Sequence, residues 1–369
     1  MKTIRLGLFG LGRGSAFYKV LKALDGELVA VCERYAPRCK EAKEFWGDNL
    51  AVYDNFDDFI NHDMDAVFLC NCFHEHAPYA IKCMEKGIPV LSECTAAGTL
   101  ADAVELVRAY EKYGTMYMLS ENYPFMLFNQ EMRKVFRGGS LGELLYAEGE
   151  YNHPSDNPPG SPTNNDIVKY LRPYEKHWRN YLPRTYYLTH SLAPLMWITG
   201  KTPRKVTAMP IYKPHLSRDI HNGDVGAIML LTNDDNSVFR VTGNVAFGAR
   251  EDSYRICGTK GQIENVRKEW NGDNEVVLNY TKWAVPEGMS SHNRYIPKHE
   301  TEADRLEAEK AGHGGGDYYV IKEFFRCIRE NVKPEMDVYF ATTMAAVGIL
   351  GFRSILENRP FDIPDFKNE

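Results

Sequence analysis

Apolar and polar residues follow a regular strand and helix pattern from residue 1 to about residue 120. Helical patterns cover residues 77–86 and 101–113 and stop at Gly87 and Gly114. Short apolar runs predict buried strands between the helices, at residues 4–9, 28–32, 65–70, 88–91 and 116–119. This βαβ alternation predicts a doubly wound parallel sheet whose ligand binds at the carboxyl ends of its strands.

The pattern changes from about residue 125. A helical pattern at 128–137 is followed by an alternating strand at 144–151, and residues 152–186 are polar and irregular. The aromatic content of that long segment favours a packed active-site cover rather than a linker. Later runs predict antiparallel strands, at residues 205–212, 225–232, 238–246, 253–257 and 275–280. A charged, lid-like segment and two helices are predicted after them, at residues 300–310, 318–330 and 339–357.

These patterns predict an α/β protein of two domains, in agreement with its 369 residues. Residues 1–122 are expected to form a Rossmann domain with a doubly wound parallel sheet that binds NAD(P). Residues 123–369 are expected to form a second domain, an α+β domain with a mainly antiparallel sheet. The final helices are candidates for packing back on the Rossmann domain.

The most informative motif is the glycine cluster Gly10-Leu11-Gly12-Arg13-Gly14, between the first strand and a helical pattern at residues 17–21. Such glycines let the backbone approach a pyrophosphate at a helix N-terminus, although Ser15 stands where the third glycine or alanine usually falls. Glu33 ends the second strand, where a carboxylate accepts hydrogen bonds from an adenosine ribose. The motif predicts bound NAD in preference to NADP, with Arg34 as the residue that argues for the 2′-phosphate.

Composition and charge narrow the partners and the compartment. A formal net charge of −6 leaves no basic surface for nucleic acid, and eight cysteines without a CxxC pair predict reduced thiols and no metal site. The first strand leaves no room for a signal peptide. The apolar segment at residues 341–356 contains Arg353 and is better explained as a core helix than as a membrane span. We therefore expect a cytoplasmic protein.

Several further segments resemble the glucose–fructose oxidoreductase/inositol dehydrogenase family. Besides the glycine cluster and Glu33, they are residues 71–78, 87–93 and 258–261. The resemblance extends over essentially the whole chain. It implies a Rossmann domain and an open, largely antiparallel α/β domain with the active site between them. It also implies a tightly held NAD or NADP, and homo-oligomers, dimers or tetramers, formed through the outer face of the second sheet.

Two departures separate the chain from the dehydrogenases of that family. Those enzymes follow the glutamate of the fifth strand with lysine and proline, whereas Glu93 here precedes Cys94. They also place an aspartate four residues before a histidine, whereas Tyr186 precedes His190 here. With these changes the chain resembles a branch of NAD-dependent glycoside hydrolases acting on α-N-acetylgalactosaminides, on residues 121–122, 146–152, 187–190, 312–317 and 360–366.

That branch implies a redox-neutral cleavage with a recycled NAD. Hydride leaves C3 of the sugar, and the resulting ketone acidifies the C2 proton. A base removes that proton, and the C1 substituent is eliminated. Water then adds to the unsaturated ketone, and NADH returns the hydride. Such chemistry needs groups of middling pKa and no ammonium group. Direct displacement at the anomeric carbon instead needs two facing carboxylates, and the sequence offers no convincing pair.

His190 is the predicted general base, because imidazole titrates at about pH 6.5. Pro194 places the start of its helix near Ser191, since proline is best tolerated in a first helical turn. Tyr187 and Tyr151 are the other catalytic candidates, with packing as their structural alternative.

The remaining candidates fall into two groups. Beyond the glycine turn and Glu33, the predicted cofactor contacts are Asn71, His76, Glu93 and Asn122. The predicted substrate contacts are His153, Trp178, Arg179 and His313. Helix capping is the alternative for His76, and a flexible turn before a helix capped by Asp317 is the alternative for His313.

Two other functions are considered beside the glycosidase. The chain is alternatively an NAD(P)-dependent sugar or polyol dehydrogenase, in which a tyrosine replaces the missing lysine, or a catalytically idle nucleotide-binding sensor. The missing lysine and aspartate argue against the dehydrogenase, and His190 with its aromatic neighbours argues against the sensor. The expected partner of either enzyme is a small carbohydrate.

Overall fold

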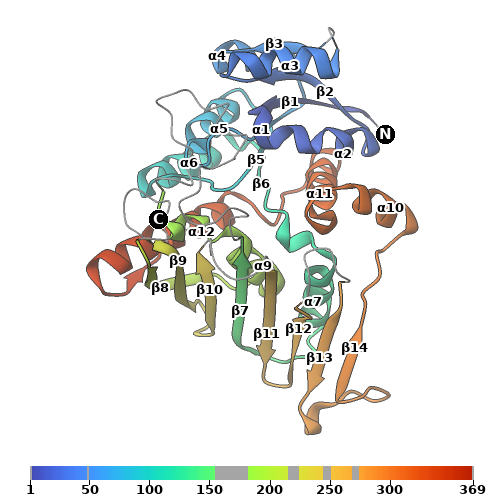
Figure 1. The fold of residues 1–369 in the computed structure, drawn as a ribbon, viewed down its shortest axis with the longest axis vertical. Helices are drawn as coiled ribbons and strands as arrows, with labels where there is room; N and C mark the ends of the chain where they lie inside the picture. The colour runs from blue at the N-terminus through green and yellow to red at the C-terminus, as the bar shows by residue number, and fades with distance from the viewer. Residues whose placement is uncertain are drawn as a thin grey trace. The chain divides into compact units, whose positions relative to one another are not determined.

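The computed structural model describes residues 2–47, 50–153, 182–214, 224–243, 251–267 and 274–367 (Figure 1). Contacts divide the chain into two compact units. Among the described residues, the first unit holds the chain up to Ser120 together with Asp317–Ala345. The second unit holds the intervening described residues, from Glu121 to Gly316, and Ala346–Glu369.

The first unit is built on a six-stranded parallel sheet with the strand order β3-β2-β1-β4-β5-β6 (Figure 1). Its strands are β1 (Ile4–Phe9), β2 (Gly26–Cys32), β3 (Ala51–Tyr53), β4 (Ala66–Leu69), β5 (Val90–Ser92) and β6 (Tyr117–Leu119). The order reverses between β1 and β4, and ligands of such sheets bind at this reversal, beyond the carboxyl ends of the strands. The predicted doubly wound parallel sheet is confirmed.

The helix α6 (Leu100–Tyr113) begins and ends where the sequence supplies caps. The Thr99 side chain accepts a hydrogen bond from the Asp102 backbone N–H at the start of α6, and Gly114 ends α6 with a φ of 63°. The helices before Ser120 are α1 (Leu11–Gly14), α2 (Tyr18–Ala23), α3 (Ala36–Trp46), α4 (Phe56–Phe59), α5 (His76–Glu85) and α6 (Leu100–Tyr113).

Two late helices contribute to the first unit, α11 (Gly316–Glu330) and the beginning of α12 (Val338–Glu357). Arg329 donates a hydrogen bond of 2.8 Å from Nη2 to the carbonyl of Leu24, just before β2. Gly26 lies under Phe325 so closely that a Cβ would stand 2.7 Å from the ring. The α11 helix is therefore anchored against β2.

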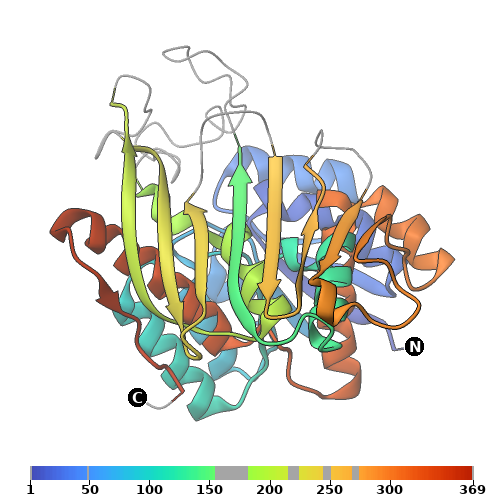
Figure 2. The ribbon, with the colours of Figure 1, turned by 90° about the horizontal axis from the view of Figure 1, so that it is seen from below.

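The second unit is built on a nine-stranded sheet with the order β14-β13-β12-β11-β7-β10-β9-β8-β15 (Figure 2). Its neighbouring strands pair antiparallel, except that β10 runs parallel to β7. Its strands are β7 (Leu144–Asn152), β8 (Pro203–Tyr212), β9 (Asp224–Asn233), β10 (Val238–Gly243), β11 (Glu251–Gly258), β12 (Gly261–Asn265), β13 (Val276–Tyr280), β14 (His292–Tyr295) and β15 (Phe361–Asp362). The predicted open and mainly antiparallel sheet is confirmed.

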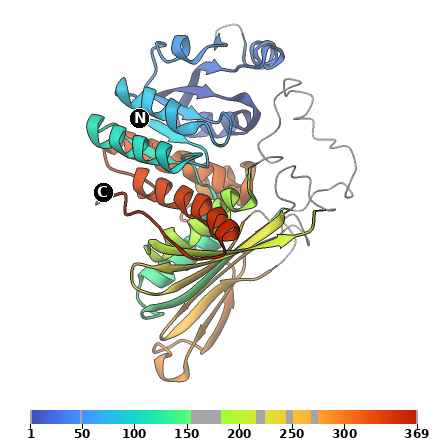
Figure 3. The same ribbon diagram turned by 90° about the vertical axis from the view of Figure 1, so that its left-hand side faces the viewer.

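One face of this sheet carries α7 (Leu127–Arg137) and α9 (Thr189–Thr199) (Figures 2 and 3). All residues of α9 are buried. Gly149 on β7 permits this packing, because a Cβ there would lie 2.1 Å from the carbonyl oxygen of Ser191. In the described part of the second unit, no helix covers the opposite face (Figure 3).

That uncovered face is ionic in the centre and apolar near one edge. Arg240 donates from Nη2 to Glu148 at 2.7 Å and to Glu150 at 2.8 Å, on the neighbouring β7. Toward the edge, Met209 on β8 is 72% exposed and Leu230 on β9 is 51% exposed. Apolar residues thus extend to both faces of β9.

Among the described residues, α12 is the one helix long and apolar enough to cross a membrane by length and composition, and 72% of its most apolar window is buried. Gly351 packs on Met229 of β9, where a Cβ would lie 2.9 Å from the sulfur. Such burial is typical of a core helix.

The charged segment predicted near residues 300–310 forms α10 (Glu302–Lys310). Most of the long segment 152–186 lies outside the described residues.

Candidate functional site

The glycine turn connects β1 to α1 and has the close backbone approaches that its glycines predict. Gly10 has a φ of 94°, and a Cβ there would lie 2.4 Å from the carbonyl oxygen of Cys70. Gly14, the last residue of α1, packs against β1, and a Cβ on it would stand 2.6 Å from Leu8 Cδ1. Gly14, rather than Ser15, therefore provides the close helix–strand packing that the third glycine of such motifs provides.

Glu33 lies at the carboxyl end of β2, beside this turn. Its buried carboxylate accepts hydrogen bonds from the backbone N–H of Leu11 at 2.9 Å and of Tyr35 at 3.0 Å. Arg38 of α3 approaches it to 3.7 Å, a contact that the sequence analysis did not identify. Arg34, which could have paired with a 2′-phosphate, donates to Glu75 at 3.0 Å.

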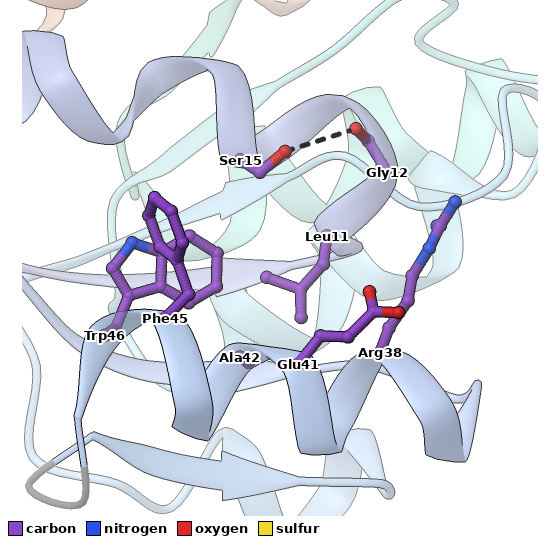
Figure 4. A pocket seen from close by; sticks show the side chains of 8 residues that line it. All are labelled: Leu11, Gly12, Ser15, Arg38, Glu41, Ala42, Phe45 and Trp46. Carbon is purple, nitrogen blue, oxygen red and sulfur yellow. Dashed lines mark hydrogen bonds between the residues drawn. The ribbon is translucent and has the colours of Figure 1, made fainter.

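A pocket of about 400 Å³ adjoins the turn on the side of α3. Figure 4 shows Phe45 and Trp46 together at one end of the pocket and Arg38 at the other, with Leu11 between them. Its lining residues are Leu11, Gly12, Ser15, Arg38, Glu41, Ala42, Phe45 and Trp46.

The other cofactor candidates of the first unit follow β4 and β5. Asn71 donates from Nδ2 to the carbonyl of Glu75 at 3.4 Å. His76 is 1% exposed, and its Nδ1 donates to the carbonyl of Thr95 at 2.8 Å. Burial lowers the pKa of His76 to about 4, so its ring is neutral at pH 7. His76 thereby fixes the loop that follows β5.

These residues fit a dinucleotide. The surroundings of Gly10 leave no space for a side chain. A turn without side chains is what close backbone contact with a pyrophosphate requires. Glu33 would hold the adenosine ribose, and Glu93, directly after β5, would face the nicotinamide end.

The catalytic candidates of the second unit meet around His190. Its Nδ1 lies 2.6 Å from Glu121 Oε1, and its Nε2 lies 2.8 Å from the Tyr187 hydroxyl. Because a carboxylate only accepts, the proton of a neutral ring belongs on Nδ1, and Nε2 accepts from Tyr187. Glu121 is 0% exposed and His190 is 7% exposed. A carboxylate, an imidazole and a phenol thus form one hydrogen-bonded chain.

Aromatic rings enclose the same imidazole. Tyr123 stacks on it with ring centroids 4.0 Å apart and an interplanar angle of 21°. Tyr151 of β7 meets it edge-on, at 4.7 Å and 85°. Burial raises the pKa of Tyr123 well above its ordinary value, so this phenol remains protonated. The orientation of His190 is therefore fixed at both nitrogens and by its neighbouring rings.

The helix that carries His190 begins earlier than predicted. α9 starts at Thr189 instead of near Ser191, and Pro194 lies inside it rather than in its first turn. Proline has no N–H for the carbonyl four residues before it, which belongs to His190. The Tyr254 hydroxyl donates to that carbonyl instead, at 2.6 Å. The proline is tolerated because a side chain replaces the lost helical hydrogen bond.

Glu121 is the main site residue that the sequence analysis missed. The resemblance included it, but no role was assigned, and the chain lacked an acid four residues before His190. Glu121 supplies that carboxylate from 69 positions earlier. Its position directly after a buried strand, beside Asn122, is the one local signal that could have identified it.

Two predicted substrate contacts lie close to this cluster. His153 follows β7, with its ring centroid 5.8 Å from that of Tyr151. His313 has a φ of 53°, and its ring centroid lies 6.0 Å from that of Tyr123. Trp178 and Arg179, the other two predictions, lie outside the described residues.

The glycines around His313 are required by their surroundings. Gly315 has a φ of 91°, and a Cβ at Gly316 would lie 2.4 Å from the carbonyl oxygen of Asn122. Asn122 is itself buried. Gly316 is thus packed directly against the backbone of Asn122, which follows β6 in the chain.

Comparison with known families supports both halves of this description. Residues 4–121 match the family described as "Oxidoreductase family, NAD-binding Rossmann fold", and residues 198–369 match "Glycosyl hydrolase 109, C-terminal domain". Glycosyl hydrolase family 109 proteins of Saccharopolyspora erythraea and Porphyromonas gingivalis are 25% and 23% identical to this chain. The alignments cover 99% of this chain and 83% and 85% of those proteins.

Solved structures show the same fold. Levoglucosan dehydrogenase in complex with NADH and L-sorbose superposes with a TM-score of 0.79, at 16% identity, over 99% of this chain and 100% of that one. Scyllo-inositol dehydrogenase from Lactobacillus casei, with bound NAD(H) and scyllo-inositol, gives 0.71 at 18% identity, over 98% and 99%. At such identity the likeness concerns the fold alone.

Proposed function

We propose that this chain, which belongs to the glucose–fructose oxidoreductase/inositol dehydrogenase (Gfo/Idh/MocA) family, is a redox-neutral glycoside hydrolase working through a transient 3-keto sugar. Members of the family are NAD-dependent glycosidases or oxidoreductases, so the chain is an enzyme and not an idle sensor. The observation that carries the proposal is the hydrogen-bonded chain Glu121–His190–Tyr187.

When bound, NAD⁺ would accept hydride from C3 of the sugar, while the C3 hydroxyl proton leaves to solvent. At the end of the cycle the hydride would return to C3, and the C3 oxygen would regain a proton from solvent. Between these steps the ketone at C3 acidifies the C2 proton. The Tyr187 oxygen takes that proton while its own proton passes to His190 Nε2, because Nε2 is already hydrogen-bonded to this phenol. The buried carboxylate of Glu121 stabilises the imidazolium that forms. His190 is thus the base, acting through Tyr187.

Loss of the C2 proton expels the C1 substituent, whose oxygen takes a proton from Tyr151. Water then adds its hydroxyl to C1, and the other proton of the water restores Tyr151. The imidazolium exchanges its proton with solvent before it returns one through Tyr187 to C2. Every proton donated by the protein is thereby regained.

Direct displacement at the anomeric carbon fits the cluster poorly. It requires two carboxyl groups on opposite sides of the scissile bond, roughly 5–10 Å apart. Glu121 is fully buried and hydrogen-bonded to His190, so its carboxylate is occupied in orienting the base.

The runner-up is an NAD(P)-dependent sugar or polyol dehydrogenase. The same Tyr187–His190 pair can take a hydroxyl proton while hydride leaves the adjacent carbon, and the solved neighbours include sugar and inositol dehydrogenases. The two functions differ in whether NADH accumulates.

The deciding experiment is turnover of a panel of nitrophenyl glycosides, α-N-acetylgalactosaminide included, in heavy water. We expect deuterium at C2 of the released sugar while the total NADH stays constant. NADH accumulating one for one with consumed substrate establishes the dehydrogenase instead. Cleavage without exchange at C2 establishes direct displacement, which also refutes the proposal.

Two further properties belong to this proposal. NAD is held tightly and recycled, and it is preferred to NADP because the Glu33 carboxylate repels a 2′-phosphate; calorimetry with both dinucleotides tests this preference. The chain forms dimers or tetramers through the uncovered sheet face, since Met209 and Leu230 expose apolar surface there. A monomer in light scattering contradicts that assembly.

A further inference from the structure

Arg13 is held by two carboxylates from distant parts of the first unit. Its Nη2 lies 2.6 Å from Asp317 Oδ1 and its Nη1 lies 3.2 Å from Asp317 Oδ2, which is a bidentate pair. Its Nε donates to Glu93 Oε1 at 3.1 Å. Asp317 is 1% exposed. One side chain therefore joins the glycine turn, the loop after β5 and the first turn of α11.

The directions of these hydrogen bonds bear on what Arg13 does. An arginine in a glycine turn invites interpretation as a pyrophosphate ligand. Here its Nε and both terminal nitrogens donate to carboxylates, and its guanidinium lies 4.3 Å from the ring centre of Phe17. Burial alone lowers the pKa of Arg13, but Glu93 and Asp317 more than offset this and raise it. The charge of Arg13 is thus neutralised within the protein.

Asp317 is a fixed point for such a contact. It lies in the first turn of a helix that hydrogen bonds to the Leu24 carbonyl through Arg329 and packs on Gly26 through Phe325. The turn itself is costly to order, because α1 has four residues, two of them glycine, and glycine loses more backbone freedom on ordering than other residues do.

We propose that Arg13 and Asp317 form a positioning ion pair that holds the glycine turn in its dinucleotide-binding conformation, so that NAD⁺ affinity depends on α11. Neither residue contacts the dinucleotide in this role. The pair raises affinity by ordering the turn before the cofactor arrives, which removes an ordering penalty from binding. The inference concerns cofactor binding alone and holds for a glycosidase and a dehydrogenase alike.

The test is a double-mutant cycle on the dissociation constant of NAD⁺, measured by calorimetry on the full chain. We expect Asp317→Asn and Arg13→Ala each to weaken binding roughly tenfold or more, and the double variant to be no weaker than Arg13→Ala, because residues of one ion pair are non-additive. Arg13→Lys should also lose affinity, since lysine cannot form the bidentate fork. Arg326→Ala is the matched control, because Arg326 makes its bidentate pair with Glu323 on the exposed side of α11.

The alternative that Arg13 binds pyrophosphate makes the opposite predictions. Asp317→Asn would then free a cation and leave affinity equal or higher, Arg13→Lys would retain it, and the two effects would add. Any of these results overturns the proposal. Thermal unfolding without NAD⁺ checks that each variant is folded. If Asp317→Asn does not fold, Arg13→Lys carries the test. Loss of NAD⁺ affinity in Arg13→Lys at an unchanged unfolding temperature supports the positioning ion pair, and unchanged affinity refutes it.

Discussion

Among the described residues, each unit contains one buried histidine, His76 in the first and His190 in the second, and their hydrogen bonds differ. His76 donates to a backbone carbonyl, and its Nε2 has no partner among the described residues. His190 is hydrogen-bonded at both nitrogens to groups that exchange protons, Glu121 and Tyr187. Burial is common to both, so the difference lies in the partners. A buried histidine becomes a base only where its proton has a route in and out.

The same contrast holds for the carboxylates. In the first unit Glu33 and Glu93 accept hydrogen bonds from backbone and from Arg13, which fixes the shape of a binding surface. In the second unit Glu121 is bonded to an ionisable ring. The first arrangement suits holding a ligand, and the second suits moving a proton.

The largest expected effect is on His190. Replacing it with Ala should lower kcat for glycoside cleavage roughly 10²–10⁴-fold, the range for loss of a general base, and lower C2 deuterium exchange equally. Rates of both processes are measured in one heavy-water reaction. The control is His292→Gln, on the exposed strand β14. If cleavage and exchange fall by different factors, His190 does not serve both.

The second largest effect is expected at Glu121. Glu121→Gln keeps the shape but lets an amide donate to Nδ1, which favours the wrong tautomer of His190. The corresponding carboxylate-to-amide change beside the histidine of a Ser-His-Asp triad lowers kcat about 10⁴-fold. We therefore expect a loss in kcat no larger than that of His190→Ala, with little change in KM. Glu121→Asp should recover part of it. A variant with full activity would separate Glu121 from catalysis.

His76 should affect stability instead. Its pKa is about 4 in the folded protein, whereas an unfolded histidine titrates at about 6.5. Between these values the unfolded chain binds the proton more readily, so stability is complete above pH 6.5 and declines as the pH falls toward 4. The loss from this group should reach about 2 kcal/mol at pH 5. Urea unfolding of His76→Gln at pH 7 and pH 5 should lack this component, whereas an equal decline in both proteins would assign it elsewhere.

The smallest effect is expected at the backbone of His190. Tyr254→Phe removes the donor to a buried carbonyl and should lower the free energy of unfolding by about 1 kcal/mol or somewhat more. Pro194→Ala restores a helical N–H for the same carbonyl. The double variant should therefore be more stable than Tyr254→Phe alone, as measured by thermal unfolding. An additive loss would show that the proline does not expose this carbonyl.

The sequence predicted those features that depend on neighbours in the chain. The glycine turn and Glu33 were found because strand, turn and acid follow one another within one βαβ unit, and their placement is confirmed. The strands β3, β12, β14 and β15 were missed. The first, third and fourth of these have four residues or fewer, too few for a clear alternation, and β12 follows a turn directly.

The interactions that could not be predicted join distant segments. Glu121 lies 69 positions from His190, and Asp317 lies 304 positions from Arg13. Their pairing depends on how helices pack, which hydrophobic periodicity does not encode. The early start of α9 was mispredicted for a related reason. Pro194 is tolerated inside the helix because the Tyr254 hydroxyl, from the distant strand β11, bonds the carbonyl of His190.

The return of the chain to the first unit at Asp317 has a consequence for recombining this protein with its relatives. A gene cut near codon 121 falls at the end of the region that matches the NAD-binding family, but it removes α11, with Arg329 and Asp317, from the sheet that α11 supports. Chimaeras that exchange the nucleotide-binding half must therefore carry residues 317–345 from the same parent. A library built with two crossover points should yield folded hybrids where a single crossover yields few.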